Sequence, residues 1–313
     1  MPLTVILATA GYDHKLRYWD ANTGACTRTT KYEESQVNAL QISPNKYYLA
    51  AAGNPNIHLF DVHSTTDTPV VSFEGHTGNV TGIGFQQDTQ WLFSCSEDGS
   101  IRIWDLRVAE AQRVYDCQCA VHSTILHPNQ TTLLSADQSG AVKTWDILGG
   151  RQSRSTIQVD GPARSLSIAS DGSVVTAAAH KGMLYVLEPG ENEVEGVQWS
   201  GESFRLKYTS FQAHSDYLLK TVISQGLTSM CTSSADNTIK VWDPLNDWAL
   251  IKTLKQHQRW VWDVAYSADS SFIVSASSDQ SAKLWDLRNG EVIRNYLGHT
   301  HAVTCVALND SPN

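Results

Sequence analysis

Histidine, serine and aspartate recur at a fixed spacing in three parts of the sequence, each time followed by a tryptophan. The three sets are His76, Ser96, Asp98 and Trp104; His214, Ser234, Asp236 and Trp242; and His257, Ser277, Asp279 and Trp285. These residue types could form a nucleophilic triad, in which Asp orients a His that activates the Ser hydroxyl. Three copies at one spacing, with no nucleophile elbow beside any of them, favour a structural role instead. We expect a hydrogen-bond chain from Asp through His and Ser to the Trp N–H, which satisfies polar groups that each unit buries.

The units that hold these sets repeat along the chain and end in Trp-Asp or a degenerate pair. Their last residues are Asp20, Asp61, Asp105, Asp146, Glu188, Asp243 and Asp286, which are 41, 44, 41, 42, 55 and 43 residues apart. A period of about 40–45 residues with this ending is the signature of a WD-repeat blade. Within a unit, apolar and polar residues alternate between Gly, Asp and Asn turns, which predicts antiparallel strands. The sequence therefore predicts an all-β fold: a single seven-bladed WD-repeat β-propeller.

The two ends of the chain are expected to share one blade. Residues 1–31 contain only three strands of a unit, and residues 299–308 contain the missing first strand. Their pairing would close the ring and remove exposed sheet edges. Residues 1–313 are thus interpreted as one domain, with an acidic insertion near 189–210 at the one irregular spacing. Two units are degenerate, and the fifth has His180 where the turn Asp is expected.

Composition narrows the classes of function. Of the 313 residues, 41% are hydrophobic and 18% are charged, with a formal net charge of −9. No basic run occurs, which argues against nucleic acid as a partner because phosphate binding needs clustered Lys and Arg. No signal peptide is recognisable and no stretch approaches the roughly 20 apolar residues that span a bilayer, so we expect a cytoplasmic protein without direct membrane insertion. The six Cys lack metal-ligand spacing; we expect reduced thiols, no metal, no cofactor and a monomeric propeller.

A protein-binding surface is expected at the top entrance of the ring, where each innermost strand begins. Aligning the units on their His places Trp260 and Trp262 there, on the side opposite the core residue Val261. The corresponding positions of neighbouring units hold Tyr217, Leu219, Gln36, Asn38, Tyr12 and His301. These side chains should form an aromatic patch beside polar residues. Exposed apolar patches mark protein contacts, and Trp and Tyr dominate their binding energy.

Several longer motifs are more specific than the blade pattern. They lie at residues 5–14, 35–40, 126–130, 137–141, 259–262 and 276–279. Together they resemble the WD-repeat small subunit of target of rapamycin (TOR) kinase complexes, a family called G-protein-beta-subunit-like or "lethal with Sec thirteen, protein eight". The resemblance covers essentially the whole chain, and residues 147–212 are the most divergent.

That resemblance implies a non-catalytic scaffold that binds and stabilises the catalytic region of the TOR serine/threonine kinase. The scaffold would belong to both TOR complexes, contact their other subunits, support growth and nutrient signalling, and reach endomembranes only through the complex. The resemblance also implies that Trp260, Trp262 and Tyr217 face the kinase, with Gln36 and Asn38 on the same face.

Two other functions are compatible with a propeller. A generic WD-repeat adaptor, such as a ubiquitin-ligase substrate receptor or a peptide reader, should carry a recruiting domain or a cage at the central channel. An enzyme built on a propeller would need acids or His ligands that the blades do not already use.

Overall fold

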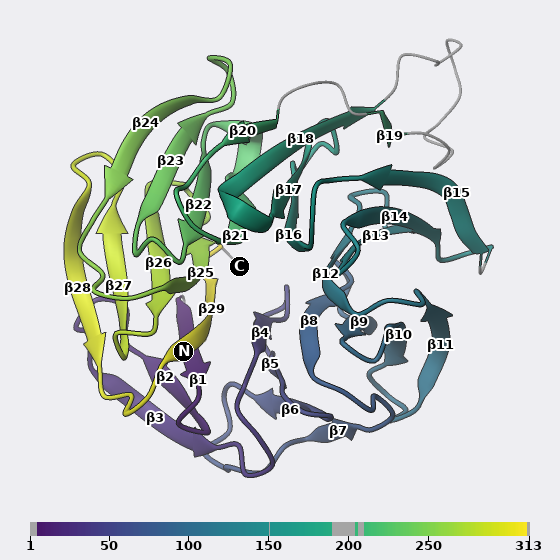
Figure 1. Cartoon of the computed structure of the whole chain (residues 1–313). Coiled ribbons are helices and arrows are strands. Elements are labelled where there is room, and N and C mark those ends of the chain that lie inside the picture. The colour runs from purple at the N-terminus through teal and green to yellow at the C-terminus, as the bar shows by residue number, and fades with distance from the viewer. Residues whose placement is uncertain (1–4, 150, 190–203, 206–209, 312–313) are drawn as a thin grey trace.

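Seven small antiparallel sheets stand around a central axis in the computed structural model (Figure 1). The structure describes residues 5–149, 151–189, 204–205 and 210–311. Two 3₁₀ turns, η1 (His180–Gly182) and η2 (Gln225–Leu227), are the only helical elements in these ranges, and none of the described helices could span a membrane. The predicted all-β, seven-bladed propeller is confirmed.

The blades are numbered here in chain order, and each is given from its innermost strand outward. Blade 1 contains β29 (Val303–Asn309), β1 (Ile6–Gly11), β2 (Lys15–Trp19) and β3 (Cys26–Lys31). Blade 2 contains β4 (Ala39–Ile42), β5 (Tyr48–Ala52), β6 (Ile57–Asp61) and β7 (Val71–Phe73). Blade 3 contains β8 (Val80–Phe85), β9 (Trp91–Ser96), β10 (Ser100–Asp105) and β11 (Ala111–Asp116). Blade 4 contains β12 (Val121–Leu126), β13 (Thr132–Asp137), β14 (Ala141–Asp146) and β15 (Arg151–Gln158).

The remaining three blades follow the same order. Blade 5 contains β16 (Ala163–Ile168), β17 (Val175–Ala179) and β18 (Met183–Pro189), with the short strands β19 (Phe204–Arg205) and β20 (Ser210–Gln212) both paired to β18. Blade 6 contains β21 (Leu218–Ile223), β22 (Met230–Ser234), β23 (Ile239–Asp243) and β24 (Ala249–Leu254). Blade 7 contains β25 (Val261–Tyr266), β26 (Phe272–Ser277), β27 (Ser281–Asp286) and β28 (Glu291–Leu297). Most of the acidic insertion predicted near 189–210 lies outside the described residues.

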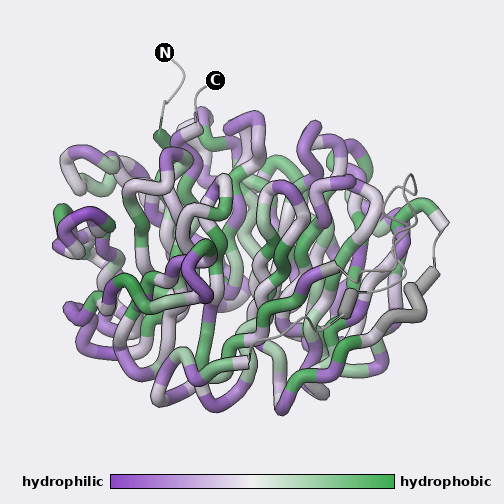
Figure 2. The backbone as a smooth tube through the Cα atoms, turned by 90° about the horizontal axis from the view of Figure 1, so that it is seen from above, coloured by the Kyte–Doolittle hydropathy of each residue, from purple (hydrophilic) through white to green (hydrophobic). Residues whose placement is uncertain are grey.

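Blade 1 joins the two ends of the chain, as predicted. Strand β29 pairs antiparallel with β1 from Ile6 opposite Asn309 to Gly11 opposite Val303. The first and last described residues consequently lie on the same face of the ring, as the edge-on view shows (Figure 2). This pairing removes the free edge that β1 would otherwise present.

The apolar core lies between blades. Seven clusters of buried apolar side chains fill the seven interfaces between neighbouring sheets. In four of them a Trp packs against an aromatic residue of the preceding blade with ring centroids 5.0–5.5 Å apart: Tyr296–Trp19, Phe73–Trp104, Tyr115–Trp145 and Phe211–Trp242. Burying one such ring removes roughly 150–250 Å² from water. At about 25 cal/mol per Å², that favours folding by ~4–6 kcal/mol.

Candidate protein-binding face

The buried hydrogen-bond chains exist, but they run through a different hydroxyl from the one predicted. In blade 3 the Nε1 of Trp104 donates to Ser94 Oγ (2.8 Å), and this hydroxyl lies 2.8 Å from Nε2 of His76. The Nδ1 of His76 lies 2.8 Å from Asp98 Oδ2 and donates to it, so the Ser94 hydroxyl must donate to Nε2. Thr232 and Ser275 take the place of Ser94 in blades 6 and 7.

The assignment of Ser96, Ser234 and Ser277 to these chains is therefore wrong. Each of these residues ends its strand, too close to the turn to reach the Trp, and its Oγ accepts the backbone N–H of the turn Asp at 3.1–3.2 Å. Two of the hydroxyls also donate to the loop that precedes the innermost strand. Ser234 bonds the carbonyl of Tyr217 (2.9 Å) and Ser277 that of Arg259 (3.1 Å). These serines position the predicted binding loops instead.

Blade 1 contains a fourth complete chain, which the sequence analysis missed. Trp19 Nε1 donates to Thr9 Oγ1 (2.7 Å), Thr9 lies 2.8 Å from Nε2 of His299, and Nδ1 of His299 lies 2.9 Å from Asp13 Oδ2. His299 comes from the end of the chain and the other three residues from its beginning. The signal for this chain is a Ser or Thr ten residues before the Trp, which Thr9 shares with Ser94.

Burial and hydrogen bonding determine the protonation states of the His and Asp side chains in the hydrogen-bond chain of blade 3. Burial lowers the pKa of His76 from its usual value of 6.5, more than the adjacent Asp98 raises it. Burial alone would raise the pKa of Asp98, but hydrogen bonds from Ser100, the backbone of Thr77 and His76 lower it to about 2. The histidine is thus held neutral and the aspartate ionised. Both are committed to neighbouring groups, which leaves no free Ser–His pair for nucleophilic chemistry in this blade.

A β-bulge aims one residue of most innermost strands toward the mouth of the central channel. In β25 the register shifts between Val261 and Asp263, so that Trp262 is the extra residue, and in β21 the corresponding shift extrudes Leu219. A bulge bends its strand and redirects one side chain. Leu219 and Trp262 line the channel, whereas Val261 is fully buried in the core.

The structure brings three of the predicted rings together as an aromatic patch, defined as Tyr217, Trp260 and Trp262. The ring centroids of Tyr217 and Trp260 are 6.4 Å apart in an edge-on arrangement, and those of Trp260 and Trp262 are 5.5 Å apart. Tyr217 is 38% exposed and Trp260 is 40% exposed. The patch spans blades 6 and 7, and His180 of blade 5 extends it with its ring centroid 4.5 Å from that of Tyr217.

Ser278, which sequence reasoning did not single out, bonds the backbone of Trp260 and the side chain of Trp262. Its backbone N–H donates to the carbonyl of Trp260 (2.9 Å), and its Oγ accepts the indole N–H of Trp262 (2.7 Å). One turn residue thus fixes the backbone of Trp260 and the ring of Trp262 before a partner binds, and such preorganisation lowers the entropy cost of binding.

The other predicted residues lie around the same entrance but outside the patch. Tyr12, Gln36 and Asn38 line the channel together with Leu219. Tyr12 is exposed and shows no ring contact with the patch among the described residues. His301 is exposed beside Thr300, whose hydroxyl lies 3.1 Å from its Nδ1, and it does not line the channel.

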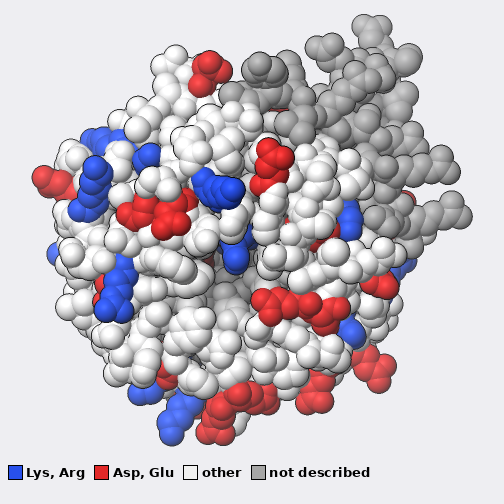
Figure 3. Space-filling model, viewed as in Figure 1, with Lys and Arg blue, Asp and Glu red and all other residues white. Residues whose placement is uncertain are grey.

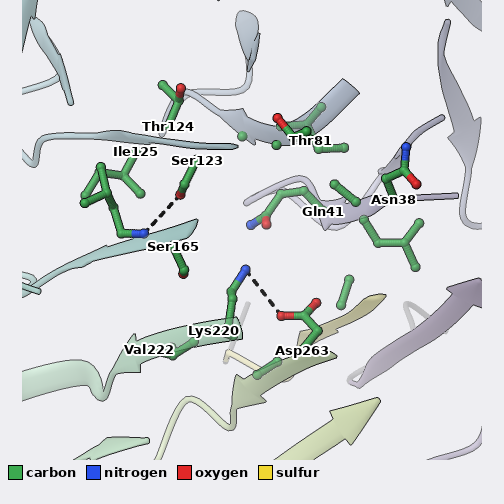
Figure 4. A pocket seen from close by; sticks show the side chains of 18 of the residues that line it. Asn38, Gln41, Thr81, Ser123, Thr124, Ile125, Ser165, Lys220, Val222 and Asp263 are labelled. Atoms are coloured by element: carbon green, nitrogen blue, oxygen red, sulfur yellow. Dashed lines mark hydrogen bonds and ion pairs between the residues drawn. The ribbon is translucent and has the colours of Figure 1, made fainter. Parts of the chain in front are cut away.

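The channel itself is polar, encloses about 800 Å³ and opens as a hollow at the ring centre (Figures 3 and 4). Side chains bridge neighbouring innermost strands around it. At the base of the patch, Lys220 of β21 and Asp263 of β25 form an ion pair of 3.3 Å, and Asp263 also accepts the N–H of Val306 in β29 (3.0 Å). Between blades 5 and 6, Ser165 Oγ accepts the N–H of Thr221 (3.3 Å). We call these bridging side chains (Lys220, Asp263 and Ser165) the channel belt.

Groups that could hold a metal are not found in the described ranges: no three His, Cys, Asp or Glu side chains gather there in a suitable cluster. On the face drawn in Figure 3, acidic and basic side chains are interspersed around the hollow. Because neither sign of charge dominates this face, the aromatic patch and the polar residues at the entrance are its distinguishing features.

Comparisons with known proteins agree with this architecture. The WD domain, G-beta repeat family matches residues 24–61, 67–105, 205–243 and 248–286. The chain is 44% identical to the target of rapamycin complex subunit wat1 of Schizosaccharomyces pombe, over 98% of this chain and 96% of wat1. It is 45% identical to the target of rapamycin complex subunit LST8 of Saccharomyces cerevisiae, over 98% of this chain and 100% of that protein. It is 37% identical to LST8 of Mus musculus, over 98% and 95% of the two chains. Since such relatives align over nearly their full length, the chain belongs to the LST8 family of WD-repeat proteins.

Proposed function

We propose that the protein is a non-catalytic subunit of TOR kinase complexes, and that it binds and stabilises the catalytic region of the kinase through the aromatic patch. The names of the relatives from both yeasts support membership of such a complex. The observation that carries the docking site is the contiguous set of rings at Tyr217, Trp260 and Trp262, of which Tyr217 and Trp260 are exposed and Trp262 is half-buried.

The chemistry of the patch suits a protein interface. Trp and Tyr are the side chains that most often dominate binding energy, because they bury much area with few torsions to fix. A standard interface buries roughly 1,600 Å² in total. The patch would supply its apolar centre, and the polar entrance residues Gln36 and Asn38 would lie at its rim.

The proposed mechanism adds no catalytic group to the kinase. The His, Ser or Thr, and Asp side chains that resemble a triad are bonded to one another and to a buried Trp in blades 1, 3, 6 and 7. A rigid face that binds one arrangement of a kinase segment better than others shifts the population toward that arrangement. We further propose that the propeller acts as a monomer in the cytoplasm and meets membranes only through its complex.

The test is capture of the kinase from native cell extract. Tagged wild-type protein is compared with a Trp260→Ala/Trp262→Ala variant, and bound proteins are identified by mass spectrometry. The matched control is Tyr47→Ala, because Tyr47 is 58% exposed but follows the β4–β5 turn at the opposite end of the strands. We expect the wild type and the control to capture a TOR kinase and the double variant to lose it while melting normally.

Each alternative outcome has a definite meaning. Capture of the kinase by the folded double variant would place the docking site elsewhere on the propeller. Failure of the wild type to capture any TOR kinase, with a ubiquitin ligase in its place, would favour the adaptor reading instead.

A further inference from the structure

The residues that the bulges extrude at the channel mouth differ in what they already bind. Register shifts of the innermost strands single out Thr81, His122, Arg164, Leu219, Trp262 and Thr304, and blade 2 places Asn38 at the same entrance. All seven line the channel. They form a ring in which each blade contributes one side chain.

Four of the polar members of this ring are bonded within the propeller. The hydroxyls of Thr81 and Thr304 each donate at 2.6 Å to a carbonyl of the next blade. His122 lies 2.5 Å from the amide oxygen of Gln138, and Asn38 donates to the carbonyl of Gly53 at 3.5 Å. These side chains are held by internal contacts before a partner arrives.

Arg164 is different. It is exposed, and its guanidinium makes no hydrogen bond or ion pair within the described part of the chain, although the protein has 32 acidic against 23 basic residues. Its fixed fork of N–H donors matches the two oxygens of a carboxylate. An arginine left unpaired at the mouth of a binding surface therefore offers its charge to a ligand.

On one side of Arg164, the residues that follow in the ring are apolar and lie on strands joined by side-chain bridges. The bulged residues of the next two blades are Leu219 and Trp262. Arg164, Leu219 and Trp262 each directly precede one residue of the channel belt. The belt, made of Ser165, Lys220 and Asp263, bridges blades 5, 6 and 7. The belt thereby joins the strands that carry a strip of side chains, which runs from a cation to two apolar residues across three adjacent blades.

We propose that the docked partner segment carries a carboxylate beside an apolar side chain, the carboxylate binding Arg164 and the apolar side chain packing on Leu219 and Trp262. This inference rests on the proposed function and specifies the chemistry of the segment that occupies the site. Positive charge at Arg164 complements that carboxylate, and the indole of Trp262, already bonded to Ser278, is left with its apolar ring for packing.

The experiment measures the affinity of purified variants for the immobilised kinase catalytic region. Arg164→Glu reverses the charge, Arg164→Gln removes it, and Arg164→Lys keeps the charge without the fork. Arg288→Glu is the matched control, because Arg288 is exposed on the turn after β27, at the end of the strands away from the patch. Each protein is titrated at low and at high salt, and its melting temperature is recorded.

We expect Arg164→Glu to raise Kd by at least about tenfold, Arg164→Gln by less, and Arg164→Lys by least, while Arg288→Glu binds like the wild type. A tenfold change corresponds to about 1.4 kcal/mol. The salt dependence of binding should be shallower for Arg164→Gln than for the wild type, because a charge pair is screened by salt.

The outcomes separate this inference from the proposed function. If Arg164→Glu binds like the wild type while Trp260→Ala/Trp262→Ala does not bind, the carboxylate is excluded and the docking face stands. If Arg164→Glu and Arg288→Glu weaken binding equally, only net charge matters and the inference is overturned. If the wild type does not bind the kinase region, both proposals fail together.

Discussion

Replacement of Thr9 by Val should destabilise the whole propeller, although the two side chains have nearly the same shape. Thr9 is fully buried, accepts the indole N–H of Trp19 and donates to Nε2 of His299. Val removes the hydroxyl and leaves two buried polar groups without a partner. Each such group costs ~1–3 kcal/mol, so we expect a loss of about 3 kcal/mol in the free energy of unfolding.

The corresponding shift in melting temperature follows from the size of the protein. An unfolding entropy of ~2.1 cal/mol/K per residue, applied to the 313 residues, converts 3 kcal/mol into a decrease of about 5 °C. The assay is thermal unfolding followed by near-ultraviolet circular dichroism, which reports the packing of the tryptophans. Thr9→Ser is the matched control, because it keeps the hydroxyl and loses one buried methyl, which costs only ~1 kcal/mol.

Two results would refute this reasoning. If Thr9→Val melted within 1 °C of the wild type, the hydrogen-bond chain of blade 1 would contribute nothing measurable. If Thr9→Ser fell as far as Thr9→Val, the effect would come from packing and the hydroxyl would be irrelevant.

Two further predictions concern the same buried chains. Ser94→Ala should lower the free energy of unfolding by ~2–4 kcal/mol, because it leaves both Trp104 and His76 without a hydrogen-bond partner. Ser96→Ala loses only a contact within the turn and should cost about 1 kcal/mol. Equal effects of the two variants in urea titrations would contradict the assignment of the chain to Ser94. Stability should fall as the pH drops below about 6.5, because burial lowers the pKa of His76 and the unfolded chain then binds the proton more readily. It should fall again between about pH 4 and pH 2, because the pKa of Asp98 is about 2 in the fold against 3.8 ordinarily. A urea midpoint that is as high at pH 5 as at pH 8 would contradict this argument.

The number of blades and the closure of the ring could be predicted because both depend on local repetition. Each unit ends in an apolar-x-apolar-Trp-Asp strand or a degenerate copy, and the count of such strands is independent of how the sheets pack. The missing strand of blade 1 is likewise visible as an incomplete unit at one end and a lone strand at the other. Period-two alternation then places the residues that face the core.

The identity of the bonded hydroxyl could not be read from alternation. Ser94 and Ser96 lie two residues apart, point to the same side of β9 and are both fully buried. What separates them is the register between β9 and β10, in which Ser94 lies opposite Arg102 in the body of the strand. Alternation does not fix that register, whereas the constant distance of ten residues between the hydroxyl and the Trp is visible in the sequence and distinguishes Ser94 from Ser96.

The loops that carry the predicted binding face could be located from the sequence, whereas the directions of their individual side chains could be located only in part. Trp260 and Trp262 were expected on one side of the strand, and their ring contact confirms that geometry. The bulge that directs Trp262 to the channel depends on pairing with β26, and the belt joins residues about 43 positions apart in different blades. Such contacts exist only once the blades are assembled.

Pairing of β1 with β29 also sets an order of events during synthesis. Thr9 and its partner His299 are separated by 290 residues. At the usual ~5–20 residues per second, the ribosome needs on the order of 15–60 s to make the second after the first. During that interval β1 can pair with β2 but has an unpaired edge on its other side. The hydrogen-bond network that begins at the indole of Trp19 also lacks His299. The first blade to be translated is therefore the last that can be completed, and contacts of such long range make folding slow. Blade 1 is where the nascent chain is most exposed to mispairing with another strand.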